Sequence, residues 1–260
     1  MLKKLLKYDI KSYANTLLPI FGLTLLLAVF SRIFMLLKDL APVFRVPMGL
    51  VMGLAMLLTS AVPFITFVIG IDRFNKQMTK DEGYLTHTLP VKKHTIISSK
   101  LLTQILFQIA SVIVSLCSAC IIVNVKLVDL KEAIKLIIEM ITQYSALTPI
   151  LVLLIILFGY IVMTLLIYTA ISFGQRHATN KSKFAILYGI IIYIIQQIIT
   201  SVIYAPLLMD DKITRELEKT LPSATVLNIS LLISLSALLI TSVAYYYLTT
   251  RNLEKKLNLE

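Results

Sequence analysis

The chain has 260 residues, of which 58% are hydrophobic and only 15% are charged, and its mean hydropathy is +0.87. A soluble domain is typically about 45–50% apolar and about 25% charged, so this composition excludes an ordinary soluble protein and indicates an all-α, polytopic membrane protein. The net charge of +11 comes from lysines and arginines that cluster beside the apolar runs. This arrangement is typical of a membrane protein, and we expect no nucleic-acid partner.

The first predicted element is an interfacial helix over residues 1–13. Its apolar side chains fall on one helical face, namely Leu2, Leu5, Leu6, Ile10 and Tyr13. Four lysines lie on the other faces, so the apolar face is expected to lie in lipid and the lysines to face anionic headgroups. A frayed basic tail is the alternative interpretation.

Six long apolar runs follow, and each supplies the roughly 20 residues that a helix needs to cross about 30 Å of hydrocarbon. They predict membrane-spanning helices over residues 15–37, 47–71, 101–125, 149–175, 184–208 and 230–250. Pro149 is suited to the first turn of the fourth helix. The whole chain, residues 1–260, is expected to form one transmembrane domain.

The distribution of Lys and Arg predicts the orientation. If the N-terminus is cytoplasmic, 16 of the 25 Lys and Arg residues lie on the cytoplasmic side, as the positive-inside rule requires. Both termini are then cytoplasmic, and the protein is expected in the plasma membrane of a bacterial cell.

Two further elements are predicted on the outer side. Residues 129–145 show an amphipathic pattern that predicts a helix lying on the membrane. Residues 210–229 are expected to form a short surface or re-entrant element, because Pro222, Ser223 and Asn228 are poorly suited to the middle of a lipid-facing helix.

The sequence carries no pattern of a catalytic or metal site. The charge-free cores of the spans hold no Asp, Glu, Lys, Arg or His, and the three histidines lie in polar segments. No G-x-x-x-x-G-K-[ST] motif is present, so the chain does not bind ATP through a P-loop. Cys117 and Cys120 are interpreted as ordinary apolar residues. We therefore expect no enzyme and no cofactor bound by this chain.

Uncharged polar residues form two helical stripes. The third span carries Gln104, Gln108, Ser111, Ser115 and Ser118, and the fifth carries Tyr193, Gln196, Gln197, Thr200 and Tyr204. For the third span, hydrogen bonding between packed helices is the favoured interpretation. For the fifth, helix packing and the lining of a translocation path are both open. A Gly49-x-x-x-Gly53 pattern in the second span would permit another helix to approach closely.

The longest polar interruption, residues 72–100, forms the first cytoplasmic loop. Thr79 and Glu82 have the spacing of a capping box, and Pro90 ends any helix that follows. This pattern predicts a short helix of roughly residues 80–88 that exposes Tyr84, Leu85 and His87. Exposed aromatic and aliphatic side chains on the watery side of a membrane protein favour a docking surface.

This loop resembles that of the ABC-2 type permeases of bacterial ABC transporters. The resemblance rests on the six predicted spans and on an acidic residue, a Leu-Pro-Val triplet, basic residues and a Lys-Leu-Leu helix start, which here are Glu82, Leu89-Pro90-Val91, Lys92-Lys93 and Lys100-Leu101-Leu102. It implies an ABC-2 (type V exporter-like) fold with a coupling helix formed by Asp81, Glu82, Tyr84, Leu85, His87, Leu89 and Pro90.

The resemblance also implies the partners. Two copies of a separate ABC ATPase would carry ATP and Mg, and a second permease chain, identical or different, would complete a path lined mainly by helices one, two and five. The element at 210–229 would be an outer gate. The expected function is export of a hydrophobic or amphipathic peptide or drug across the lipid bilayer. The alternatives are a membrane immunity or anchor protein that binds a toxic peptide without transporting it, and a secondary carrier.

Overall fold

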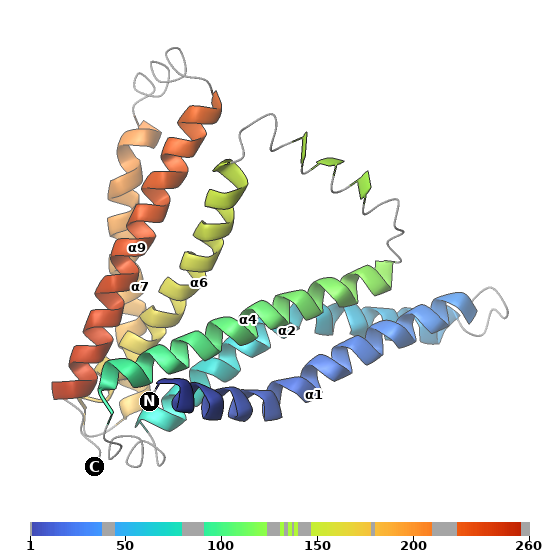
Figure 1. Ribbon diagram of the computed structural model, residues 1–260, viewed down its shortest axis with the longest axis horizontal. Coiled ribbons are helices and arrows are strands. Elements are labelled where there is room, and N and C mark those ends of the chain that lie inside the picture. Colours follow the sequence, from blue (N-terminus) through green and yellow to red (C-terminus); the bar gives the residue numbers. More distant parts are fainter. Residues whose placement is uncertain are drawn as a thin grey trace. The chain divides into compact units, whose positions relative to one another are not determined.

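The computed structural model describes residues 2–37, 45–79, 91–123, 131–132, 135–136, 138–139, 147–177, 180–209 and 223–255. In these residues there is no strand, and six helices are long and apolar enough to cross a membrane. They are α1 (Leu2–Leu37), α2 (Arg45–Thr79), α4 (Lys93–Val123), α6 (Leu147–Gly174), α7 (Lys181–Met209) and α9 (Ser223–Lys255). The predicted all-α architecture with six apolar helices is confirmed (Figure 1).

The chain divides into two compact units. The first comprises Met1–Phe74 and Pro90–Glu132, and the second comprises Asn75–Leu89 and Ala133–Glu260. The first unit therefore contains α1, most of α2 and α4, whereas the second contains α6, α7 and α9 (Figure 1).

In the first unit, α1 and α4 run parallel and α2 runs antiparallel to both. Asp9 near the start of α1 contacts Lys100 near the start of α4, and Ala28 further along α1 packs with Ile122 near the end of α4. The residue numbers of both partners increase together, so the two helices are parallel. On α2 the residue numbers decrease instead: Arg73 contacts Ser12 near the start of α1, whereas Ala55 packs with Ala28 further along α1. An apolar cluster between these levels joins all three helices, with Tyr13, Leu17, Phe21 and Val62 at its centre and Phe107 packed against it.

In the second unit, α6 and α9 form a parallel pair in constant register. Among the hydrogen-bonded pairs that link them, three join residues that are 80 positions apart: Thr148 with Asn228, Thr169 with Thr249, and Ser172 with Asn252. The remaining helix, α7, runs antiparallel to α6, because Gly174 lies against Ala185 while Gly189 lies against Ala170.

Several predicted boundaries differ from those in the structure. The interfacial helix 1–13 and the first span 15–37 form one continuous helix, α1. No glycine or proline separates them, and Asp9 and Tyr13 face α4 from successive turns of the same helix. The second and third helices also extend into the predicted loop 72–100, since α2 continues to Thr79 and α4 begins at Lys93.

The last span begins earlier than predicted. Residues 223–229, which were expected to belong to the outer gate element, are the first two turns of α9. The polar side chain of Asn228 is accommodated there because its Oδ1 accepts a 2.8 Å hydrogen bond from Thr148 Oγ1 of α6. Pro149 does lie in the first turn of α6, as predicted.

Some predicted elements lie wholly or partly outside the described residues. The coupling helix, residues 80–90, and the remainder of the gate element, residues 210–222, are outside them. Of the outer helix 129–145, only six residues are described. These are helical and exposed, and they include an ion pair between Lys135 and Glu139 at 3.8 Å.

Candidate functional site

In the first unit, a cluster of polar side chains between α1 and α4 surrounds Asp9. Ser99 Oγ donates a 2.7 Å hydrogen bond to Asp9 Oδ2, and Lys100 Nζ lies 3.6 Å from Asp9 Oδ1. Asp9 is 9% exposed and Lys100 is 5% exposed. A buried charge is tolerated where it is paired and hydrogen-bonded, and Asp9 has both kinds of partner.

One turn further along both helices, a second polar contact connects α1 to α4. Tyr13 Oη lies 3.2 Å from Gln104 Oε1, to which it donates, and 3.4 Å from the carbonyl oxygen of Gly70 on α2. Gln104 Nε2 donates to the carbonyl oxygen of Phe67 at 3.5 Å. A Cβ at position 70 would overlap the side-chain amide of Gln104, so a glycine there leaves room for this amide between α2 and α4.

Arg73 joins the end of α2 to the start of α1. Its guanidinium donates to Ser12 Oγ and Thr16 Oγ1, and it lies over the Tyr13 ring at 5.1 Å from the ring centroid. A guanidinium stacked on an aromatic face gains a cation–π attraction in addition to its hydrogen bonds. Asp9, Tyr13, Arg73, Lys100 and Gln104, together with Ser99, form what we call the three-helix polar cluster.

The polar contacts of this cluster connect three helices. Among the described residues, no group of three or more His, Cys, Asp and Glu side chains could hold a metal ion. What the cluster does is bind the start of α1, the end of α2 and the start of α4 together.

The polar stripe on α4 faces the interior of the first unit, as predicted for helix packing. Gln104, Ser111 and Ser118 are fully buried. Ser115 Oγ donates a 2.7 Å hydrogen bond to the carbonyl oxygen of Thr59 on α2. Gln104 and Ser115 therefore bond neighbouring helices, whereas Ser111 Oγ donates to the Gln108 carbonyl oxygen of its own helix. The buried Gln108 Oε1 and Ser118 Oγ have no hydrogen-bond partner among the described residues, so the interpretation favoured from the spacing holds for two of the five residues.

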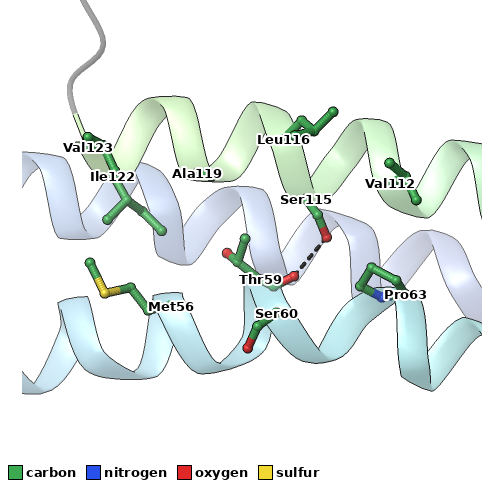
Figure 2. A pocket seen from close by; sticks show the side chains of 10 residues that line it. All are labelled: Met56, Thr59, Ser60, Pro63, Val112, Ser115, Leu116, Ala119, Ile122 and Val123. Atoms are coloured by element: carbon green, nitrogen blue, oxygen red, sulfur yellow. Dashed lines mark hydrogen bonds between the residues drawn. The ribbon is translucent and has the colours of Figure 1, made fainter. Parts of the chain in front are cut away.

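Beside this contact, a largely apolar groove of about 370 Å³ lies between α2 and α4 (Figure 2). Its lining contains no charged side chain and consists of Met56, Thr59, Ser60, Pro63, Val112, Ser115, Leu116, Ala119, Ile122 and Val123. Gly49 and Gly53, which were expected to permit the close approach of a helix, face open space in the described chain, since a Cβ added at either position would have no atom within 4 Å.

Cys117 and Cys120 are free thiols on the exposed side of α4.

The predicted path residues on α7 divide into two groups. Gln196 takes part in packing, because its Oε1 accepts a 2.8 Å hydrogen bond from Tyr245 Oη of α9. Tyr193 and Gln197 are exposed, and Thr200 is half-buried. The side chain of Tyr204 and all seven predicted coupling residues lie outside the described residues.

A second polar site joins the end of α6 to the end of α9. Thr169 Oγ1 lies 2.9 Å from Thr249 Oγ1, and Asn252 Nδ2 donates to Ser172 Oγ at 3.4 Å. Arg176, just beyond α6, donates to Asn252 Oδ1. The short connection from α6 to α7 is closed by His177, whose ring stacks on Phe184 at 3.7 Å between centroids.

The sequence had singled out Gln104 of the three-helix polar cluster as a helix-packing residue, but neither site as a whole was predicted from it. Asp9 was overlooked because its neighbours are four lysines, which placed the segment at the membrane surface. The available signal was that Asp9 is the one acidic residue in an otherwise basic segment and falls four residues before Tyr13, on the same helical face. An acidic side chain on that apolar face requires a buried partner.

The described geometry thus defines an all-helical, multi-pass class of membrane protein, with six apolar helices in two three-helix units. No family model, no curated protein and no solved structure matches the chain.

Proposed function

We propose that this chain is the membrane-spanning permease subunit of an ATP-driven transporter of the ABC-2 type. It would not itself be an enzyme, since two copies of a separate ABC ATPase would bind ATP and Mg and dock on residues 80–90. A second permease chain would complete the translocation path in a bacterial plasma membrane, with both termini cytoplasmic. The transported substrate would be a hydrophobic or amphipathic peptide or drug.

The observation that carries this proposal is that α1 bonds to both helices that flank the loop, about two turns from where each helix meets it. The loop lies between the end of α2 and the start of α4. Arg73 links the α2 end to Ser12 and Thr16 of α1, and Lys100 links the α4 start to Asp9 of α1. A docking segment held in this way would pass a displacement to three spanning helices at once.

The interior of the spans supports the same proposal. Carriers driven by protons or sodium commonly have an ionisable side chain at membrane depth, and none occurs in the charge-free cores of the six runs. The described polar groups there include hydroxyls that bond a neighbouring helix or their own backbone, such as those of Ser115 and Thr169. Energy would then enter from the cytoplasmic side, through the loop.

The test is a double substitution in the loop, Tyr84→Ala with Leu85→Ala. Truncation of an interface hot spot costs about 2 kcal/mol or more, close to thirtyfold in affinity. We expect the variant to insert normally, because no span is changed, and to lose ATPase binding in pull-down or to uncouple ATP hydrolysis from transport in nanodiscs. The ATPase would be the one encoded beside this gene or the one that co-purifies with the chain.

A matched control is Lys131→Ala with Leu136→Ala, which changes two exposed side chains in the segment predicted on the outer side. This control should bind the ATPase and transport like the unmodified protein. If the loop variant also behaves like the unmodified protein, residues 80–90 are an ordinary connector and the proposed function loses its support.

A secondary carrier is the second candidate that the sequence left open. Gradient-driven transport in proteoliposomes that contain this chain alone, without ATP, would support a carrier and contradict the ATP-driven proposal.

A further inference from the structure

We propose that Asp9, Ser99 and Lys100 form a rigid link that makes the first turns of α1 and the first turns of α4 move as one body. The consequence for transport rests on the proposed function, because the link would pass motion of the loop to α1. The rigidity of the link itself does not depend on any partner.

The geometry gives each oxygen of the Asp9 carboxylate its own partner on α4. Ser99 Oγ is 2.7 Å from Oδ2 and Lys100 Nζ is 3.6 Å from Oδ1. Because the two partners are consecutive residues, a shift of α4 along or around its axis would break both interactions together. Ser99 is fully buried, and its position is reinforced by Thr103 Oγ1, which donates to the Ser99 carbonyl oxygen at 2.9 Å.

A second contact in the same register makes the link resistant to tilting. Tyr13 follows Asp9 by four residues and Gln104 follows Lys100 by four residues, so the Tyr13–Gln104 hydrogen bond lies one turn above the ion pair on both helices. The Tyr13 ring also stacks on Phe107 with 5.4 Å between centroids. Two connections one turn apart define the relative angle of two helices as well as their separation.

The composition of the link points to positioning more than to net stability. A buried ion pair often contributes no more stability than apolar side chains of the same volume, whereas removal of one partner is strongly destabilising. Such a pair does specify register. It also lies close to the loop, because α4 begins at Lys93 with a 2.9 Å bond from Thr95 N to the Lys92 carbonyl oxygen, so Lys100 is about two turns from the last loop residue.

Hydrogen–deuterium exchange of the purified chain in nanodiscs tests the rigidity. Asp9→Asn keeps the side-chain shape and removes the charge. We expect amides of residues 2–13 to exchange about tenfold to a hundredfold faster, as for loss of a buried hydrogen bond to a charged group, while those of α6 are unchanged. Lys7→Gln, an exposed position on the same helix, is the control and should exchange like the unmodified chain.

Ser99→Ala removes one hydrogen bond and retains the ion pair, so it should give a smaller increase over the same residues. The exchanged pair Asp9→Lys with Lys100→Asp should restore slow exchange. If Asp9→Asn leaves residues 2–13 unchanged, or accelerates all helices equally, the link is overturned, whatever the fate of the proposed function.

The ratio of molecules transported to ATP hydrolysed tests the consequence. We expect Asp9→Asn to lower this ratio while ATPase binding is retained, and Lys7→Gln to leave it unchanged. Faster exchange with an unaltered ratio would overturn the coupling role, whereas loss of ATPase binding by the loop variant concerns the proposed function alone.

Discussion

The hydroxyl oxygens of Thr169 and Thr249 lie 2.9 Å apart across the contact between α6 and α9. Both residues are fully buried. Each hydroxyl has one proton, so one of the two donates to the other, while the second donates to a backbone carbonyl oxygen of its own helix, that of Leu165 for Thr169 or that of Tyr245 for Thr249. The pair belongs to a constant register in which partners are 80 residues apart. It therefore marks the register of the second unit.

Thr169→Val should weaken the α6–α9 contact, because it removes the hydroxyl and leaves the shape of the side chain. We expect the free energy of unfolding to fall by about 0.6–2 kcal/mol, the range for hydrogen bonds between membrane helices. Thermal unfolding in detergent measures the loss. Thr250→Val is the matched control, since the Thr250 hydroxyl donates within its own helix to the Tyr246 carbonyl oxygen, and an equal loss in both variants would contradict the assignment.

Gly174→Ala should destabilise the connection between α6 and α7. A Cβ at Gly174 would lie 2.7 Å from the backbone nitrogen of Ala185 and from the carbonyl oxygen of Lys181, and a backbone cannot yield as a flexible side chain can. Overpacking of this kind costs about 1–3 kcal/mol. Gly159→Ala is the control on the same helix, with no atom of the described chain within 4 Å, and it should be neutral or slightly stabilising in the same unfolding experiment.

Gln196→Leu and Gln197→Leu should have different effects although the residues are adjacent. Gln196 accepts a hydrogen bond from Tyr245 Oη, so its replacement should lower thermal stability. Gln197 is exposed, so its replacement should spare stability and, if α7 lines the path, alter transport or substrate-stimulated ATP hydrolysis. Normal stability and normal transport in Gln197→Leu would exclude that residue from the path.

Cysteine labelling tests the predicted orientation. In a Cys117→Ser, Cys120→Ser background, a cysteine at Lys131 or at Glu216 should react with an impermeant maleimide on whole cells, and a cysteine at Lys93 should react only after permeabilisation. The reason is that 16 of the 25 Lys and Arg residues then lie on the cytoplasmic side. Labelling at Lys93 from outside would reverse the orientation.

The sequence by itself determined the elements of this fold. Six apolar runs predicted six spans, because the thickness of the hydrocarbon sets the number of residues a helix needs to cross it. The spacing of Gln104, Ser111 and Ser118 predicted a packed polar face on α4, because residues three or four apart share a side of a helix, and all three are fully buried. Both inferences depend only on local geometry along one helix.

Only the tertiary structure decided which helices pack against each other and in which register. Asp9 and Lys100 are 91 residues apart in the chain, and neither periodicity nor composition relates their positions. The same holds for Thr169 and Thr249, and for Gln196 and Tyr245. Because Gln196 is hydrogen-bonded to Tyr245, it takes part in helix packing, whereas the adjacent Gln197 is exposed. Two of the boundaries that shifted, at the start of α1 and of α9, lie where Asp9 and Asn228 find partners on another helix. Burial of a polar group costs free energy unless it is hydrogen-bonded, and for Asp9 and Asn228 the partner comes from packing between helices.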